Sequence, residues 1–369
     1  MSTITPIVMP KWGLEMREGT VTAWLVDEGA EIAVGTPILD VETDKISNAV
    51  EAPDPGLLRR RVAQEGEVLP VKALLGVLAD ASVPEAEIDA YIANYVVPAA
   101  AAEGEEAESA YASAEVDGFR LRYARRGPEG GVPVLFLHGF GGDLDNWLFN
   151  LDAVAEAAPV IALDLPGHGQ STPKLPGTTL ADFARIVLHF LDALDVARAH
   201  LVGHSMGGAI AARLALDHPA RVASLTLVNS AGLGDEIDAG YIDGFVAAGS
   251  RRELKPVVEK LFANPELVTR QLLDDLLKYK RLDGVGEALG RLGSALFGGG
   301  RQAEQPGREL PASLPLLVIW GREDRIVPAA HADHAPVHAR RELFDGAGHM
   351  AMMEKASEVN ALIRRHVAG

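Results

Sequence analysis

An acidic segment without a single basic residue divides this chain. Between Ala73 and Phe119 there is no Lys or Arg, while ten Asp and Glu residues fall in the same stretch. Its middle, residues 81–115, is rich in Ala, Glu, Ser and Pro, a composition that buries too little apolar surface to form a core. The chain of 369 residues is also longer than one hydrophobic core usually supports. We therefore expect two domains, residues 1–80 and 116–369, joined by an acidic linker over residues 81–115.

Residues 1–80 carry short runs of Val, Ile and Thr separated by turn residues, which is typical of a small all-β domain. A weak repeat runs through them: Gly19, Glu28, Gly29 and Val34 recur as Gly56, Glu65, Gly66 and Val71, with a constant offset of 37 positions. Two similar halves are therefore expected. At their junction, apolar strand residues flank a polar turn centred on Asp44 and Lys45, so the sequence predicts a lysine at the tip of a hairpin.

The predicted linker contains one stripe of apolar residues at helical spacing. A short helix is expected over residues 84–97, with Ile88, Tyr91, Ile92, Tyr95 and Val96 on one face. Docking of this helix on its own chain is favoured over binding to a partner, and both roles stay open.

Composition excludes several classes of protein. The chain has no cysteine, which excludes disulfides, thiolate metal sites and a cysteine nucleophile, and no metal site is expected. The net charge of −18 opposes binding to nucleic acid or to anionic membranes. There is no leader-like N-terminus and no apolar run of roughly eighteen residues. We expect a cytoplasmic protein with neither nucleic acid nor membrane as partner.

After Glu115 the pattern changes to buried strands that alternate with helices, which is typical of a doubly wound α/β domain. The expected strands are Val134–Leu137, Val160–Leu163, Leu201–Val202, Leu225–Val228 and Leu316–Trp320, and the expected helices include Leu180–Leu194 and Met206–Asp217. Residues from about 233 to 310 interrupt this order with helical patterning and no strand. An inserted helical cap explains the interruption.

A Gly-x-Ser-x-Gly pentapeptide, Gly203 to Gly207, falls between a predicted strand and a predicted helix. That context places Ser205 on a sharp turn at the edge of the sheet, where its hydroxyl serves as a nucleophile. Such a serine needs a base and an orienting acid, which follow in the order Ser, Asp, His on later strand ends. Asp324 and His349 occupy those places, and Glu323 is the rival acid.

Acyl transfer also needs N–H donors for the developing oxyanion. The segment His138 to Gly142 closes the first buried strand, so we assign the donors to the amides of Phe140 and of Met206, which follows the nucleophile. His138 itself is expected to buttress the loop. With these motifs, residues 116–369 resemble the α/β-hydrolase family, whose fold supports esterases, thioesterases, carbon–carbon bond hydrolases and acyltransferases alike.

The N-terminal domain has a resemblance of its own. The run Met9-Pro10-Lys11-Trp12-Gly13-Leu14-Glu15-Met16, then Trp24, then Glu42-Thr43-Asp44-Lys45, resembles the lipoyl domain of 2-oxo acid dehydrogenase complexes, a flattened β-barrel. By this resemblance Lys45 carries lipoic acid in amide linkage. A biotin-carrying domain shares the fold, but its lysine normally lies between methionines, whereas Asp44 and Ile46 flank Lys45 here.

A lipoyl domain fused to an α/β-hydrolase domain resembles the acetyltransferase components of acetoin dehydrogenase complexes. The resemblance implies acetyl transfer from S-acetyl-dihydrolipoyl-Lys45 to coenzyme A through Ser205, His349 and Asp324. It also implies two partners, a thiamine-diphosphate-dependent acetoin-cleaving component and a dihydrolipoamide dehydrogenase. The His-x-x-x-Asp-Gly motif of the usual acyltransferase components is missing, so their symmetric trimeric core is not expected.

Two other functions stay open at this stage. The chain could be a thioesterase or esterase with a separate lipoyl carrier, or a carrier and scaffold whose hydrolase domain is catalytically incidental. Cationic residues of the cap either bind the phosphates of coenzyme A or lie on solvated helix faces, and both alternatives stay open: Arg251, Arg252, Lys255, Lys278, Lys280 and Arg281.

Overall fold

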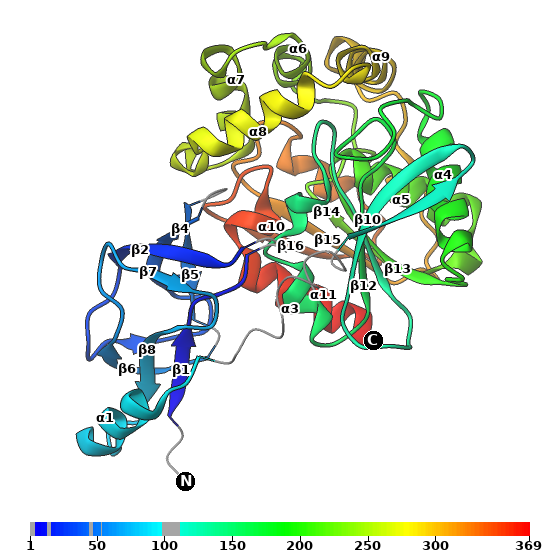
Figure 1. Cartoon of the computed structure of the whole chain (residues 1–369). Coiled ribbons are helices and arrows are strands. Elements are labelled where there is room, and N and C mark those ends of the chain that lie inside the picture. The colour runs from blue at the N-terminus through cyan, green and yellow to red at the C-terminus, as the bar shows by residue number, and fades with distance from the viewer. Residues whose placement is uncertain (1–3, 13–15, 44–46, 53, 98–110) are drawn as a thin grey trace. The chain divides into compact units, whose positions relative to one another are not determined.

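The computed structural model describes residues 4–12, 16–43, 47–52, 54–97 and 111–369. Contacts within the chain divide it into two compact units, Met1–Glu108 and Ser109–Gly369 (Figure 1). In the described part of the chain, no helix has both the length and the apolar character needed to cross a membrane.

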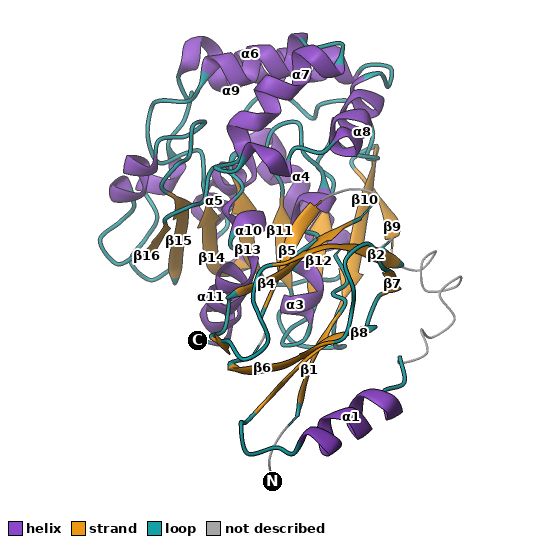
Figure 2. Ribbon diagram, turned by 90° about the vertical axis from the view of Figure 1, so that its left-hand side faces the viewer, coloured by secondary structure: helices purple, strands orange, loops and turns teal. Residues whose placement is uncertain are grey.

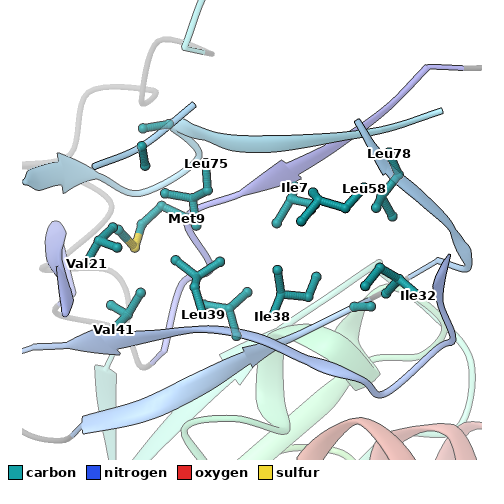
Figure 3. Close-up of a cluster of buried hydrophobic side chains, with 14 residues drawn as sticks. Ile7, Met9, Val21, Ile32, Ile38, Leu39, Val41, Leu58, Leu75 and Leu78 are labelled. Carbon is teal, nitrogen blue, oxygen red and sulfur yellow. The ribbon is translucent and has the colours of Figure 1, made fainter. Parts of the chain in front are cut away.

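The first unit consists of two antiparallel four-stranded sheets. One has the order β1 (Thr5–Val8), β8 (Leu74–Ala79), β6 (Gly56–Arg61) and β3 (Glu31–Ile32), and the other has β5 (Ser47–Glu51), β4 (Pro37–Glu42), β2 (Glu18–Trp24) and β7 (Val68–Pro70). Apolar side chains from the two sheets point toward one another, among them Ile7 and Leu75 from one sheet and Ile38 and Val41 from the other (Figure 3). The sheets therefore enclose one shared core, which confirms the expected flattened β-barrel.

The internal repeat appears as matched hydrogen bonds between the two halves. The N–H of Gly29 donates to the carbonyl of Leu58 at 2.7 Å, and 37 positions later the N–H of Gly66 donates to the carbonyl of Val21, also at 2.7 Å. Both glycines have positive φ, +89° and +84°, a conformation that costs glycine little. The repeated Glu-Gly pairs thus mark two equivalent turns, and each half closes on the other.

Strands β4 and β5 form the hairpin that was predicted to present a lysine. Their pairing runs from Pro37 opposite Glu51 to Glu42 opposite Ser47. Asp44, Lys45 and Ile46 themselves lie outside the described residues.

The helix predicted in the linker is α1 (Glu85–Asn94), and it packs on the first unit. Ile88 is buried in a small cluster with Leu74 and Val77 of β8. Glu85 pairs with Arg59 and Arg60 of β6, and the hydroxyl of Tyr95 donates to the carbonyl of Lys72 at 2.9 Å. This part of the predicted linker thus packs with the β unit, as favoured from the sequence.

The second unit is built on an eight-stranded sheet. Its order is β16 (Arg340–Phe344), β15 (Leu316–Gly321), β14 (Val222–Val228), β13 (Ala199–His204), β11 (Val134–Leu137), β12 (Val160–Leu163), β10 (Phe119–Arg126) and β9 (Tyr111–Val116). Strands β16 to β12 in that order are parallel, and β10 and β9 are antiparallel to their neighbours. Because β9 begins at Tyr111, the large domain starts five residues before the predicted position 116.

Helices cover this sheet and extend beyond one end of it. Those beside the strands are α3 (Leu151–Ala155), α4 (Leu180–Ala193), α5 (Met206–Asp217), α10 (Ala351–Glu354) and α11 (Ala356–Ala368). Short 3-10 turns span Leu144–Trp147, Pro219–Arg221, Glu259–Leu261, Pro265–Leu267, Gly298–Gly300, Pro306–Arg308 and Ala329–His334. The predicted helix 180–194 matches α4 to within one residue, and a capping box of Thr179 with Asp182 begins it.

The interruption between β14 and β15 is a helical cap. It contains α6 (Ala239–Ala247), α7 (Arg251–Val258), α8 (Arg270–Lys280) and α9 (Val285–Phe297), and these four helices lie together over one end of the sheet (Figures 1 and 2). Within residues 233–310, which are all described, the only β feature is an isolated bridge between Glu236 and Arg301. The α/β-hydrolase fold with a helical cap is confirmed.

Candidate active site

Ser205 lies on the turn between β13 and α5, with φ of 52° and ψ of −121°. Residues other than glycine rarely adopt this backbone conformation, so contacts with the surrounding structure must hold Ser205 in it. They do so through the main chain: the N–H of Ser205 donates to the carbonyl of Val228 at 3.1 Å, and its carbonyl accepts from Ala231 at 3.0 Å. The turn is thereby fixed to the next strand of the sheet.

Two glycines give this turn the space it needs. A Cβ on Gly203 would lie 2.5 Å from the carbonyl oxygen of Gly207, and a Cβ on Gly207 would lie 2.4 Å from the carbonyl oxygen of Leu137. Real Cβ contacts are never this short, so both positions require glycine. The pentapeptide pattern seen in the sequence is therefore a packing requirement of the strand, the turn and the helix.

Asp324 and His349 meet at the carboxyl ends of β15 and β16. The Nδ1 of His349 lies 2.8 Å from Oδ2 of Asp324, and both side chains are almost completely buried. Oδ1 of Asp324 accepts from the amides of Ile326 at 2.8 Å and Val327 at 2.9 Å. The carboxylate is thus oriented by two backbone donors and holds the imidazole on its other oxygen.

The rival acid, Glu323, points elsewhere. Its Oε2 accepts from the amide of Ala347 at 3.1 Å, two residues before His349 in the chain. Glu323 therefore supports the loop that carries His349, and the structure pairs Asp324 with the imidazole.

Asn229, which sequence reasoning missed, also contacts this pair. Its Nδ2 donates to Oδ2 of Asp324 at 2.8 Å and to the carbonyl of Gly348 at 3.0 Å. Asn229 follows β14 directly, at the sheet edge where Asp324 and Ser205 also stand. That position at a strand end was the signal that could have identified it.

The loop from His138 to Gly142 approaches Ser205 closely. A Cβ on Gly139 would lie 3.0 Å from the Cβ of Ser205. The next residue, Phe140, and the first residue of α5, Met206, are both buried, and among the described residues neither amide N–H has a hydrogen-bond acceptor. Buried unpaired N–H groups are rare in proteins, so two of them beside a serine are suited to an oxyanion.

Three further histidines near the site are buried and neutral. Nε2 of His138 accepts from the amide of Leu165 at 3.0 Å, and Nδ1 donates to the carbonyl of Gly139 at 2.8 Å, so this ring buttresses the loop as expected. Burial lowers the pKa of His138 to about 3 and that of His168 to about 4. Nε2 of His204 donates to the carbonyl of His349 at 2.9 Å, and burial lowers the pKa of His204 well below 6.5. None of the three is placed to act as the base.

Comparison with known families covers both units. A family model described as alpha/beta hydrolase fold matches residues 132–356, and a model of biotin- and lipoyl-carrying domains, described as biotin-requiring enzyme, matches residues 5–78.

Full-length relatives combine the same two parts. The dihydrolipoyllysine-residue acetyltransferase component of the acetoin cleaving system of Cupriavidus necator is 64% identical, over 100% of this chain and 98% of the relative. The chain belongs to this acetyltransferase family. The corresponding component of Pseudomonas putida is 50% identical, over 99% of this chain and all of the relative.

Solved structures share the fold of the large unit. A meta-cleavage product hydrolase from Pseudomonas fluorescens superposes with a TM-score of 0.62 at 24% identity, covering 70% of this chain and 97% of that one. Membership of the acetyltransferase family and the lipoyl-type small domain agree with the resemblances read from the sequence.

Strands β4 and β5 lie on either side of the residue expected to carry lipoic acid. They remain paired as far as Glu42 and Ser47, and the four-residue connection between these positions contains Lys45. In the described part of the chain, no group of three or more His, Asp or Glu side chains could hold a metal ion.

The six cationic cap residues considered for phosphate binding fall into two groups. Arg251 pairs with Asp274, Lys255 pairs with Glu259, and Lys280 donates to the carbonyls of Phe245 and Ala248 at the end of α6. Arg252, Lys278 and Arg281 are exposed and have no ion pair among the described residues. Half of the set therefore has structural partners that account for it.

Proposed function

We propose that this chain transfers an acetyl group from a dihydrolipoyl thioester on Lys45 to coenzyme A within an acetoin-cleaving system. The observation that carries the proposal is the hydrogen-bonded His349–Asp324 pair at the sheet edge where Ser205 lies on its strand-to-helix turn. The same chain contains a lipoyl-type domain. Its partners are then a thiamine-diphosphate-dependent acetoin-cleaving component and a dihydrolipoamide dehydrogenase.

The first half-reaction forms an acyl-serine. When bound to Lys45, the reduced and S-acetylated form of the lipoyl group would supply the acetyl group as a thioester. Oγ of Ser205 attacks the thioester carbonyl carbon while Nε2 of His349 takes the hydroxyl proton, and Asp324 stabilises the imidazolium that results. The unpaired amides of Phe140 and Met206 donate to the oxyanion. Collapse breaks the carbon–sulfur bond, and His349 returns its proton to the leaving thiolate.

The second half-reaction passes the acetyl group to coenzyme A. His349 takes the proton of the coenzyme A thiol, the sulfur attacks the acyl-serine, and the same amides bind the second oxyanion. The carbon–oxygen bond then breaks, and Ser205 recovers its proton from His349. Because the chain has no cysteine, both thiols of the reaction come from the lipoyl group and coenzyme A.

Water in place of the thiol would make the same machinery a thioesterase. Several relatives of the large unit are hydrolases, such as a 2-hydroxy-6-oxononadienedioate/2-hydroxy-6-oxononatrienedioate hydrolase of Burkholderia vietnamiensis, 30% identical over 70% of this chain and 95% of that one. Hydrolysis is therefore the second candidate, and the experiment must distinguish the two acceptors.

The test incubates the chain with S-acetyl-dihydrolipoamide and coenzyme A and measures both acetyl-coenzyme A and free acetate. We expect acetyl-coenzyme A as the main product, abolished by Ser205→Ala. Ser113→Ala, in the exposed strand β9 of the same unit, is the matched control and should retain full activity. Acetate as the main product would favour the thioesterase, and full activity of Ser205→Ala would refute both.

The carrier role has its own test. Intact-mass measurement after expression with lipoate should show one lipoyl group, and Lys45→Arg should lose it. Lys45→Arg should still acetylate coenzyme A from free S-acetyl-dihydrolipoamide but fail in the reconstituted acetoin-cleaving reaction. An unmodified lysine in the wild-type chain would refute the carrier assignment.

A further inference from the structure

One turn of the cap contacts the loops that carry both Asp324 and His349. This cap turn comprises residues 259–264 and contains the 3-10 turn Glu259–Leu261. It lies in the inserted helical region, between α7 and α8. The acid and the base are thus connected to each other through the cap as well as through their own hydrogen bond.

On the side of the base, backbone packs directly on backbone. The amide of Met350 donates to the carbonyl of Leu261 at 3.1 Å. A Cβ on Gly348 would lie 2.7 Å from the amide nitrogen of Ala263 and 2.9 Å from the carbonyl oxygen of Leu261. The residues on both sides of His349 therefore touch the cap turn.

Glu354 ties the same two segments together through its carboxylate. Oε2 accepts from the amide of Gly348 at 2.6 Å, while Oε1 accepts from the amides of Ala263 at 2.8 Å and Asn264 at 3.2 Å. Burial raises the pKa of Glu354, and the three N–H donors oppose that rise. One side chain thus bridges the base loop and the cap turn with charge-assisted hydrogen bonds, which are stronger than neutral ones.

Arg325 makes the corresponding link from the side of the acid. It follows Asp324 in the chain, and its guanidinium donates to the carbonyl of Glu259 at 2.7 Å and to that of Phe262 at 2.5 Å. Both carbonyls belong to the cap turn: Glu259 begins its 3-10 turn, and Phe262 follows the last residue of that turn. The cap turn is therefore held from the acid side by Arg325, next to Asp324, and from the base side by Glu354, five residues after His349.

We propose that Glu354 and Arg325 are positioning residues that use the cap turn as a brace for the His349–Asp324 pair. The inference rests on the proposed role of that pair in the reaction. A base displaced by about 1 Å can lose about a hundredfold in rate, so a brace on both loops acts on turnover. Because both side chains bond the cap turn, we expect their loss to change turnover more than the binding of the acyl donor.

The test compares single and double variants of the full chain on two substrates. Glu354→Gln keeps the size of the side chain but leaves one acceptor oxygen, which can bond either the amide of Gly348 or the amides of the cap turn. Arg325→Ala removes the hydrogen bonds between the acid loop and the cap turn. Each should lower kcat about 10- to 100-fold with little change in KM. The double variant should lose less than the product of the two single effects, because both act on one turn.

Matched controls lie beside each residue. Arg322→Ala removes an arginine of the same acid loop that pairs with Asp345 rather than with the cap, and Lys355→Gln changes the residue next to Glu354. Both should keep the wild-type kcat. Arg325→Lys, which can still donate to a carbonyl, should recover part of the loss seen in Arg325→Ala.

Two readouts separate this proposal from the proposed function. Turnover of a simple acetyl ester reports the serine, base and acid without lipoyl donor or coenzyme A. The proton NMR signal of the His349 Nδ1–H bonded to Asp324 needs no activity at all, and it should shift or broaden in Glu354→Gln and Arg325→Ala but not in the controls. Unchanged kcat together with an unchanged signal in both variants would overturn the brace, even if acetyl-coenzyme A formation holds. If the wild type forms no acetyl-coenzyme A, but the NMR signal still shifts in Glu354→Gln and Arg325→Ala, only the proposed function would be overturned.

Discussion

The two units bring their reactive residues into place by different routes. In the β unit, Lys45 falls within one hairpin, between strands that are adjacent in sequence and paired with each other. In the large unit, Ser205, Asn229, Asp324 and His349 come from four separate strand ends and are held by contacts that cross more than a hundred positions. The proposed carrier site is thus encoded locally, whereas the proposed acyl-transfer site depends on the whole sheet and on its cap.

The largest effect should follow from the acid of the large unit. Asp324→Asn replaces the acceptor of the His349 proton and should lower kcat by about 10⁴-fold, because the imidazole is no longer held in the required tautomer. Glu323→Gln, one residue away, should lose little, since Glu323 bonds the amide of Ala347. Steady-state kinetics on S-acetyl-dihydrolipoamide measures both variants. Equal losses of kcat in the two variants would contradict the assignment of Asp324, and not Glu323, as the acid that orients His349.

Glycines offer a second way to compare the units. Gly207→Ala places a Cβ 2.4 Å from a backbone oxygen and should cost about 3 kcal/mol of unfolding free energy. A Cβ on Gly66 would have no atom within 4 Å, so Gly66→Ala should lose only about 1 kcal/mol of unfolding free energy through the strain of its positive φ. Urea unfolding of each variant provides the values. Gly286→Ala, inside α9 with no atom within 4 Å, is the control and should be neutral or slightly stabilising.

A third prediction concerns the extent of the β unit. Ile88→Ala should destabilise that unit by about 2–4 kcal/mol, because Ile88 is fully buried against β8. Glu85→Gln should change the protection of β8 much less than Ile88→Ala, since the carboxylate of Glu85 is exposed to solvent. Hydrogen exchange of β8 peptides in the full chain, followed by mass spectrometry, reports both. Equal protection in Ile88→Ala and wild type would show that α1 is not part of this unit.

A fourth prediction concerns pH. Burial lowers the pKa of His168 to about 4, so the unfolded chain takes up a proton that the folded chain does not between about pH 6.5 and 4. Stability that is present above pH 6.5 is therefore lost as the pH falls through this window. His168→Phe should flatten the dependence by up to about 1.4 kcal/mol per pH unit, whatever its effect on packing. Parallel slopes for variant and wild type, in urea unfolding at pH 4.5 to 8, would contradict this.

Sequence alone was sufficient for features with a local or ordered pattern. The buried strands read as apolar runs because parallel strands are covered on both faces. The glycines around Ser205 predicted the strand-to-helix turn on which Ser205 lies, and the order behind later strands predicted the pairing of Asp324 with His349. The repeat of Glu-Gly pairs pointed to two equivalent turns, which the hydrogen bonds of Gly29 and Gly66 confirm.

Other features depend on contacts that no local pattern reveals. Glu354 and Arg325 matter because a distant cap turn supplies their partners. Strand β9 was hidden by its polar composition, since an edge strand with one exposed face needs few apolar residues. Asp117 and Gly118, with φ of 50° and 81°, form the tight turn between β9 and β10, and this Asp-Gly pair was an available hairpin signal.

In the proposed reaction, Ser205 carries the acetyl group between donor and acceptor. Rapid mixing of the chain with S-acetyl-dihydrolipoamide, acid quench and peptide mass analysis tests this directly. We expect one added acetyl group on the peptide containing Ser205, which accumulates without coenzyme A and disappears on its addition as acetyl-coenzyme A forms. Formation of acetyl-coenzyme A at full rate with no acetylated Ser205 at any time, or with acetylation of another residue instead, would contradict it.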